Sequence, residues 1–371
     1  MWKYVIIVYK NIFGGLSVAL NTGDIIDKNY KIISTLGEGA MSRVYLAEKE
    51  KTLYAIKESS TGFSSHEEEK ILINSFLRES DLLYNINHPG LPKYYKNFKY
   101  NNKMYIVMEY IKGISLEDII KASVKPPEEK RVLNWGIQLC EILFYLHTMK
   151  PESIIYRDLK PSNIIITEGD SLRLIDLGVA RHYDPAKDCD TVRLGTPGYA
   201  APEQCRKKGQ STPLSDIYAL GVVIHQLLTL HDPTVTPFKF PCIRKLNNTV
   251  SEQLEWIVNK ALNLDPKNRY IDTGLFRDEL HDYYEENFGT FTSIYRVESL
   301  CITEKQSVKN QSFFDSVESF IDPLLNRLMD LLDYKKYRWE FFFYCMILFF
   351  SIIELIYYIL TIARSNGNYG P

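Results

Sequence analysis

The spacing of apolar residues differs between two regions of the chain. Residues 30–110 hold short segments that are rich in Val, Ile, Tyr and Phe and predict β-strands: YKIISTL, RVYLAEK, TLYAIKE, KYYKNFKY and KMYIVMEY. One helix is predicted among them, near residues 66–86. Residues 115–285 contain longer stretches typical of helices, such as KRVLNWGIQLCEILFYLHTM and DIYALGVVIHQLLTL, with one hairpin inside. The pattern indicates an α+β protein with a small sheet-rich lobe followed by a larger helical lobe.

A long apolar run lies near the C-terminal end of the sequence. From residue 341 to residue 363 it reads FFFYCMILFFSIIELIYYILTIA, with Glu354 as its single charge. A helix of this length crosses a bilayer core of roughly 30 Å, so we expect a transmembrane helix over residues 339–363 that contacts the lipid bilayer through residues 341–363. The alternative is a buried helix of a soluble core. A carboxylate near mid-span is costly in lipid, so Glu354 is expected either to meet a partner helix or to be held neutral.

Charged residues beside this run predict its orientation. Lys335, Lys336 and Arg338 precede it, whereas only Arg364 and a short polar tail follow it. Because positive charge collects on the cytoplasmic side of membrane helices, we expect a single-pass protein of the cell membrane with everything before the span in the cytoplasm. Residues 364–371 would then form a short external tail that is too small to fold as a sensor domain.

Two further segments are expected outside the folded lobes. Residues 289–338 are predicted to form a juxtamembrane linker with an amphipathic helix, because apolar side chains recur at helical spacing from Phe313 to Leu332 around Pro323. That helix either packs on the soluble domain or pairs with a second copy of the chain as a homodimer contact. Residues 1–29 form an N-terminal extension, and its apolar segment MWKYVIIVYKNIF is interpreted as a strand on the following lobe or as a contact with the membrane surface.

Composition excludes some classes of partner and of site. The 371 residues carry 44 Lys and Arg against 46 Asp and Glu, a formal charge of −2, so there is no overall bias toward nucleic acid. The six cysteines lie far apart without a Cys-x-x-Cys pair, which argues against a structural zinc site and against a disulfide framework. We therefore expect no nucleic-acid partner and a reducing compartment, and any electrostatic function must be local.

Charged side chains stand between two apolar runs in the stretch IIYRDLKPSNIII. Charges this close to buried backbone are costly unless they are paired or functional. The sequence continues as IIIT, the turn EGDS at residues 168–171, and LRLI, and a hairpin about that turn would place Asn163 opposite Asp176. An amide and a carboxylate held together are oxygen ligands that suit Mg²⁺. Asp158 and Lys160 would approach the same end as a proton acceptor and a cation beside transferred phosphate. We therefore expect a phosphoryl-transfer site.

The motifs of this region resemble those of a known enzyme family. YRDLKPSN followed by DLG resembles the catalytic loop and the metal-binding motif of eukaryotic-type serine/threonine protein kinases. The family's other motifs occur in the same order: LGEGAMSRVYLA resembles the glycine-rich loop, YAIK the lysine strand, MEY the hinge, GTPGYAAPE the end of the activation segment, and DIYALG and Arg269 the supports of the helical lobe. Several of them are most similar to the bacterial branch. The resemblance implies a two-lobed protein kinase fold over residues 30–288, with the N-lobe at 30–109 and the C-lobe at 110–288.

The resemblance also implies where ATP would bind. Lys57 would contact the α and β phosphates and pair with an acid on the first helix, for which Glu79 is preferred because the acidic run at residues 67–69 follows Lys57 too closely. The backbone of Glu109 and Ile111 would bind the edge of the adenine. The remaining implied nucleotide-binding positions are Leu36, Gly37 and Gly39 of the glycine-rich loop, and Val44, Ala55, Met108 and Ile165 around the adenine.

Catalytic and regulatory roles follow from the same resemblance. Asp158 and Lys160 are the implied catalytic residues, working with ATP and with Mg²⁺. Lys160 and Thr196 together match the pattern of kinases that act on Ser and Thr hydroxyls of protein substrates. Because Arg157 precedes the catalytic Asp, control by phosphorylation of the activation segment is expected. Thr191 is the first candidate for autophosphorylation and Thr196 is the second.

Three positions depart from the family pattern. Tyr156 stands in place of the usual His, Leu177 in place of Phe, and Ser42 where a third glycine is common. None of these removes a group that would touch the metal or the transferred phosphate, so we expect a membrane-anchored serine/threonine protein kinase. A pseudokinase that scaffolds partners at the membrane is the alternative, and a kinase of small molecules with a related fold is a second one.

Overall fold

The computed structural model describes residues 19–39, 42–59, 66–101, 103–183, 195–206, 209–293 and Tyr295, all of which belong to one compact unit that spans residues 1–299. The predicted amphipathic helix and the predicted transmembrane helix lie outside the described residues, as do residues 1–18 and Thr191. No helix in the described ranges is both long enough and apolar enough to cross a membrane.

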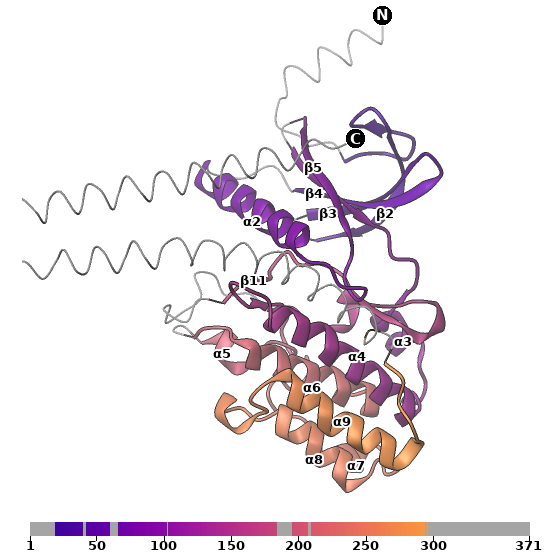
Figure 1. Cartoon of the computed structure of the whole chain (residues 1–371), viewed down its shortest axis with the longest axis vertical. Coiled ribbons are helices and arrows are strands. Elements are labelled where there is room, and N and C mark those ends of the chain that lie inside the picture. Colours follow the sequence, from indigo (N-terminus) through magenta and orange to yellow (C-terminus); the bar gives the residue numbers. More distant parts are fainter. Residues whose placement is uncertain are drawn as a thin grey trace, which may run out of the picture. The chain divides into compact units, whose positions relative to one another are not determined.

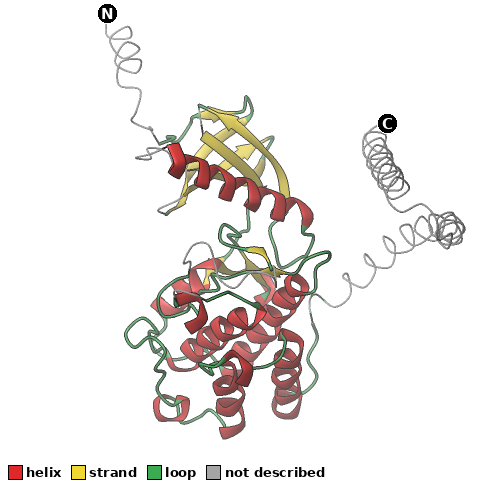
Figure 2. Ribbon diagram, turned by 90° about the vertical axis from the view of Figure 1, so that its left-hand side faces the viewer, coloured by secondary structure: helices red, strands yellow, loops and turns green. Residues whose placement is uncertain are grey.

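The first lobe is a six-stranded sheet with one helix packed against it. Neighbouring strands are antiparallel in the order β1-β2-β3-β4-β6-β5. The strands are β1 (Ile25–Ile26), β2 (Tyr30–Glu38), β3 (Ser42–Lys49), β4 (Thr52–Ser59), β5 (Tyr94–Tyr100) and β6 (Lys103–Glu109). Helix α2 (His66–Asn85) lies along one face of the sheet (Figure 2). The strands and the helix that the sequence predicts for this lobe are therefore present, with small shifts at their ends.

Successive side chains of a strand point to opposite sides, so the side chains of this sheet divide between its two faces. Tyr45, Ile56 and Val107 are cross-strand neighbours in a buried cluster that also includes a residue of β1. Ala55, one position before Ile56, and Met108, one position after Val107, are the next cross-strand pair and join the core that continues into the second lobe. Strand β1 falls within the predicted N-terminal extension and forms one edge of this sheet, whereas the segment MWKYVIIVYKNIF lies outside the described residues.

The second lobe is mainly helical (Figure 1). Its helices are α3 (Leu116–Ala122), α4 (Glu129–His147), α5 (Pro202–Cys205), α6 (Pro213–Thr229), α7 (Ile243–Leu246), α8 (Glu252–Ala261) and α9 (Thr273–Phe288). Helix α6 contacts α4, α8 and α9 and is buried without interruption from Ser215 to Leu228. A helix that is apolar on all sides belongs at the centre of a core, so α6 is the support on which the other parts of the lobe rest.

Short strands and turns carry the stretch that the sequence singled out. Strand β8 (Ile154–Ile155) pairs with β11 (Arg181–His182), and β9 (Ile164–Ile166) lies between β7 (Ile114–Ser115) and β10 (Leu172–Leu174). Single 3₁₀ turns occur at Pro161–Asn163, Glu168–Asp170 and Pro266–Asn268. The catalytic-loop motif therefore runs from β8 through a 3₁₀ turn into β9.

The predicted register of the β9–β10 hairpin is wrong by one residue. The amide of Ile175 donates to the carbonyl oxygen of Asn163 at 2.9 Å, so these two residues face each other and Asp176 follows one position later. The cause is the length of the turn. Strand β9 ends at Ile166, and the connection holds residues 167–171 instead of 168–171. Both predicted metal ligands nevertheless stay at the same end of the hairpin.

Candidate active site

Three side chains converge on the carboxylate of Asp158. Thr196 Oγ1 donates to Oδ1 at 2.7 Å, Lys160 Nζ pairs with Oδ2 at 2.7 Å, and Asn163 Nδ2 donates to Oδ2 at 3.1 Å. Lys160 Nζ also donates to Thr196 Oγ1 at 2.9 Å. The side chains of Asp158 and Lys160 are 14% and 25% exposed, so both can still be reached from solvent. The structure thus joins the predicted catalytic pair to a threonine that lies well beyond it in the sequence.

The loop that carries Asp158 is held by a buried carboxylate on α6. Asp216 is 1% exposed, and its oxygens accept the backbone amides of Tyr156 and Arg157, each at 2.8 Å, and lie 2.8 Å from His147 Nε2. Arg157 has a φ of +72°, which is unfavourable for a residue with a side chain. The two hydrogen bonds from these backbone amides to Asp216 hold the loop in this conformation. The sequence predicted DIYALG as a support of the helical lobe, but it did not identify Asp216 as the residue that binds the catalytic loop.

Tyr156, in place of the usual His, links the catalytic loop to the residue before Asp176. Its hydroxyl donates to the carbonyl oxygen of Ile175 at 2.5 Å, and its ring is fully buried. Burial, together with the charges of Asp176 and Asp158, raises the pKa of Tyr156 well above its ordinary value. The hydroxyl therefore remains protonated and remains a donor. The departure from the family pattern keeps a hydrogen bond between the two motifs.

Lys57 connects the two lobes at the site. Its Nζ donates to both oxygens of Glu79, at 2.6 and 2.8 Å, and to Oδ1 of Asp176 at 2.6 Å. Lys57 and Glu79 are both buried. Burial acts to lower the pKa of Lys57, but the charges of Glu79 and Asp176 outweigh it and raise the pKa. Burial raises the pKa of Glu79. At Asp176 burial also acts to raise the pKa, but the charge and hydrogen bond of Lys57, the amide of Gly178 and the charge of Lys160 together outweigh it and lower the pKa. The ion pair between β4 and α2 that the resemblance implies is present.

The side chains of Asn163 and Asp176 retain oxygen atoms that fit a cation. Asn163 uses its Nδ2 to bond Asp158, which turns its amide oxygen elsewhere. Within the described ranges, N–H donors reach Asp176 at Oδ1, from Lys57 and from the amide of Gly178 at 3.0 Å. No group of three or more His, Cys, Asp and Glu in those ranges forms a metal cluster. An amide oxygen and one carboxylate oxygen suit Mg²⁺, which keeps its other positions for water and phosphate.

The predicted nucleotide-binding residues lie on neighbouring strands. Ala55 and Met108 are cross-strand partners, and Val44 faces Lys57 across β3 and β4. A side chain at Gly37 would meet nothing within 4 Å, so the backbone there borders open space that can take a phosphate. The structure places Leu36 in β2, Gly39 directly after it, Glu109 at the end of β6, Ile111 in the following linker and Ile165 in β9.

Of the residues expected to control activity, the structure describes Arg157 and Thr196. Arg157 is buried, and its guanidinium donates to Ser211 Oγ at 3.1 Å and to the carbonyl oxygen of Val179 at 3.4 Å. Thr191 lies outside the described residues. The hydroxyl of Thr196 is bound between two charged groups of the catalytic loop, which fits a bracing role better than that of a phosphate acceptor.

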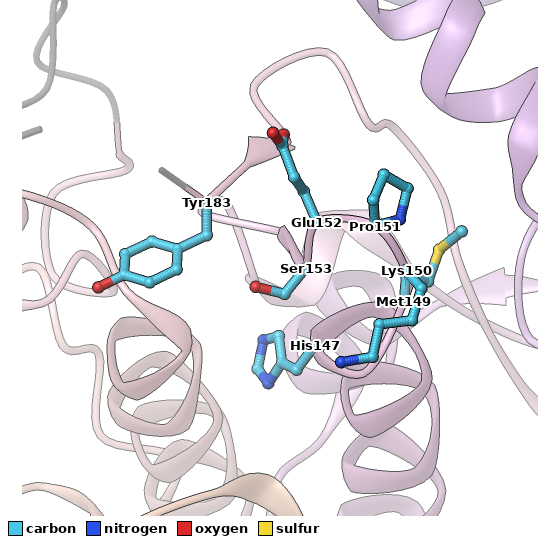
Figure 3. Close-up of a pocket in the computed structure, with 7 residues that line it drawn as sticks. All are labelled: His147, Met149, Lys150, Pro151, Glu152, Ser153 and Tyr183. Atoms are coloured by element: carbon cyan, nitrogen blue, oxygen red, sulfur yellow. The ribbon is translucent and has the colours of Figure 1, made fainter. Parts of the chain in front are cut away.

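A cavity of about 300 Å³ lies where α4 ends and β8 begins, beside the contact of His147 with Asp216 (Figure 3). This volume is at the lower limit of ligand pockets. Its lining residues are His147, Met149, Lys150, Pro151, Glu152, Ser153 and Tyr183. None of the predicted site residues is among them, so the cavity is not the nucleotide site.

Comparisons with known proteins agree with this geometry. The family model described as a protein kinase domain matches residues 30–284. The chain is 30% identical over 268 residues to the probable serine/threonine-protein kinase PknB of Lactococcus lactis, an alignment that covers 68% of this chain and 42% of that protein. It is 32% identical over 263 residues to the serine/threonine-protein kinase PrkC of Bacillus subtilis, covering 67% and 39%. The chain therefore spans less than half the length of these two relatives.

A solved structure has the same fold. The crystal structure of the Mycobacterium tuberculosis PknI kinase domain superimposes with a TM-score of 0.56 and 21% sequence identity, and the match covers 72% of this chain and all of that one. This likeness supports the two-lobed architecture, with a sheet-rich N-lobe and a helical C-lobe.

Proposed function

Because the chain belongs to the protein kinase family, we propose that it transfers the γ-phosphate of ATP to serine and threonine hydroxyls of proteins. Its kinase domain is of the serine/threonine type. The single observation that carries the proposal is the contact set of Asp158, in which Thr196 and Lys160 are held at hydrogen-bond distance from the carboxylate. This arrangement leaves the carboxylate beside a cation and next to the segment where an acceptor peptide would lie.

Each residue then has a chemical task. Asp158 orients the acceptor hydroxyl and takes its proton as the oxygen attacks phosphorus. Lys160 offsets the negative charge that develops on the transferred phosphoryl group, and Lys57 positions the other phosphates. Asn163 and Asp176 would hold Mg²⁺, which neutralises phosphate charge when it is bound. Catalysis of this kind is mostly positioning and electrostatics, which agrees with the number of contacts that fix the loop.

The test is phosphate transfer by the full chain. Wild type and Asp158→Asn are incubated with ATP labelled at the γ-phosphate and a mixture of Ser- and Thr-containing peptides, and the modified sites are mapped. We expect the variant to be at least roughly 100-fold slower and to remain folded at the assay temperature. Asp278→Asn, an exposed carboxylate on α9, is the matched control. Equal labelling by Asp158→Asn and wild type would reject the assigned base, and ATP binding without any transfer by wild type would favour the pseudokinase scaffold.

We also propose that the chain phosphorylates its own activation segment, with Thr191 as the acceptor. Support comes from Arg157, a buried arginine next to the catalytic Asp. The Thr196 hydroxyl, in contrast, is already hydrogen-bonded to Asp158 and Lys160. Mass spectrometry after incubation with ATP should find phosphate on Thr191 and none on Thr196. Phosphate on Thr196 in an active preparation would contradict this assignment.

Membrane attachment is the third part of the proposal. It rests on the apolar run at residues 341–363 and on the basic residues before it. A single span with the kinase domain in the cytoplasm, and pairing of two copies through the juxtamembrane helix, follow as proposals. The full chain should sediment with membranes and resist extraction at high pH, whereas a chain truncated after Arg338 should not. Release of both by high pH would reject the anchor, and chemical cross-linking of the full chain tests the pair.

A further inference from the structure

The chain does not leave the kinase domain at the end of α9. Residues 289–293 and Tyr295, here termed the C-terminal strap, turn back along α4 toward the N-lobe (Figure 1). The sequence pattern predicted a linker from residue 289 onward. The described part of that linker instead makes specific contacts with three parts of the domain.

The first two contacts fix the strap to the helical lobe. The ring of Phe291 packs edge-on against Tyr284, with centroids 5.1 Å apart, and against His281 at 5.6 Å. Ser293 Oγ lies 2.7 and 2.8 Å from the two oxygens of Glu141 on α4. The amide of Tyr295 donates back to Ser293 Oγ at 3.2 Å, which sets the direction of the next residues.

Tyr295 makes the third contact and is 3% exposed. Its hydroxyl donates to the carbonyl oxygen of Leu172 in β10 and lies 3.5 Å from Ser171 Oγ. Its ring lies 5.1 Å from that of His88, which also contacts the ring of Tyr145 at 4.9 Å. Burial, with the charge of Arg173, lowers the pKa of His88 to about 4, so the imidazole is neutral near pH 7 and packs as an uncharged ring.

The loop that contains His88 sets the position of α2. It follows the last residue of that helix, and the amide of Asn87 donates to Tyr145 Oη at 2.8 Å. The amide of Leu174 in β10 donates to the carbonyl oxygen of Gly90 at 2.8 Å. The loop therefore ties the end of α2 to α4 and to the strand that leads into Asp176. Helix α2 carries Glu79, so movement of this loop would move the acid that pairs with Lys57.

We propose that Tyr295 is a positioning residue that couples the chain beyond residue 295 to the Lys57–Glu79 pair, by holding the loop after α2 against β10. The inference rests on the proposed kinase function. A force or a partner that acts on the chain beyond residue 295 reaches Tyr295 before Ser293 and Phe291, which precede it in the sequence and attach to the helical lobe. Release of the Tyr295 ring and hydroxyl then removes one of the contacts that hold the loop, which loosens it and lowers the rate of phosphate transfer.

The experiment uses the full chain with Tyr295→Ala and Tyr295→Phe. For Tyr295→Ala we expect kcat for a Thr-containing peptide to fall about tenfold, because a ring contact and a hydrogen bond are lost together. For Tyr295→Phe, which keeps the ring, we expect a fall of about threefold. KM for the peptide should not change. Hydrogen exchange should become faster at residues 86–91 and in α2 but not in α8, an effect that a general loss of stability would not give.

The control is Tyr84→Phe, which removes the hydroxyl of a tyrosine of α2 that is 73% exposed and keeps its ring contact with Tyr94, so it should behave as wild type. Wild-type kcat and exchange in Tyr295→Ala would overturn the proposal. If that variant unfolds, Tyr295→Phe decides, and unchanged exchange at residues 86–91 in it would also overturn the proposal. Absence of transfer by the wild-type chain would reject the kinase function instead, because the exchange measurement does not depend on activity.

Discussion

Replacing Asp216 with asparagine separates the support of the catalytic loop from its chemistry. Asp216 touches neither the acceptor nor the phosphates in the proposed mechanism. Its two oxygens accept the amides of Tyr156 and Arg157, each at 2.8 Å, from inside the helical core. Asparagine has nearly the same shape but a single oxygen, so it can keep one of these bonds and must turn an N–H₂ group toward the other amide.

The expected size of the effect follows from these contacts. A hydrogen bond to a charged acceptor contributes about 1.5–3 kcal/mol, and a buried donor left without a partner costs about 1–3 kcal/mol. We therefore expect Asp216→Asn to lower the free energy of unfolding by roughly 3–5 kcal/mol, a large share of the about 5–15 kcal/mol that a domain usually has. The left-handed backbone of Arg157 would also relax, so kcat should fall by roughly 100-fold.

Two measurements check this prediction. Urea unfolding gives the loss of stability, and peptide phosphorylation well below the melting temperature gives the loss of rate. Asp272→Asn is the matched control, because Asp272 caps α9 by accepting the amide of Leu275 at 2.8 Å and asparagine is an equally good cap. Stability within about 1 kcal/mol of wild type, together with at least half of the wild-type rate, would refute the reasoning for Asp216.

Three further predictions concern the site itself. Thr196→Val removes the hydroxyl held against Asp158 and should lower kcat about tenfold in single-turnover kinetics, whereas Thr196→Ser should restore most of the rate. Lys57→Met leaves Glu79 buried without its cation, so the urea-measured stability at pH 7 should fall by about 3 kcal/mol. The loss should become smaller as the pH is lowered, because burial raises the pKa of Glu79 and protonation removes the uncompensated charge. The pKa of Asp176 is lowered on folding, so the stability it contributes is present above its unfolded pKa of about 3.9 and is lost as the pH falls through the lower folded value. Asp176→Asn should remove that component from an acid unfolding profile.

The family resemblance predicted one contact between residues that are distant in the sequence. Lys57 and Glu79 are 22 positions apart and are in contact, as the resemblance implies. The contact of Thr196 with Asp158, 38 positions earlier, was found in the structure. Local periodicity carries no information about either pair. The strands and long helices followed from apolar spacing alone, because burial of one face or of all faces leaves a regular pattern in the sequence.

The prediction from the local sequence was wrong where the backbone adopts uncommon φ angles. The hairpin turn gains a residue because Gly169 and Asp170 both adopt positive φ, +78° and +64°, and the amide of Thr167 then bonds Ser171 at 2.8 Å. The segment EGDS alone does not specify this choice. The conformation of the turn therefore sets the register of the β9–β10 hairpin, which the spacing of apolar residues does not predict.

Two other residues could not have been identified from their surroundings in the sequence. Asp216 looks like a polar residue at the start of a helix, and its partners come from a loop 59 and 60 positions earlier. Tyr295 is an aromatic residue in a polar stretch, and it is buried only because His88 and Leu172 are brought beside it. Long-range packing of this kind leaves no periodic signal.

The phenol at position 156 has a consequence for how the protein responds to acidity. Between about pH 5 and 8 a free imidazole changes its proton count, whereas a phenol whose pKa is raised does not. Tyr156 retains its single proton throughout, because burial raises its pKa. The bond to Ile175 therefore stays the same in weakly acidic and in neutral surroundings. Any variation of activity over this interval should then arise in groups other than this loop contact.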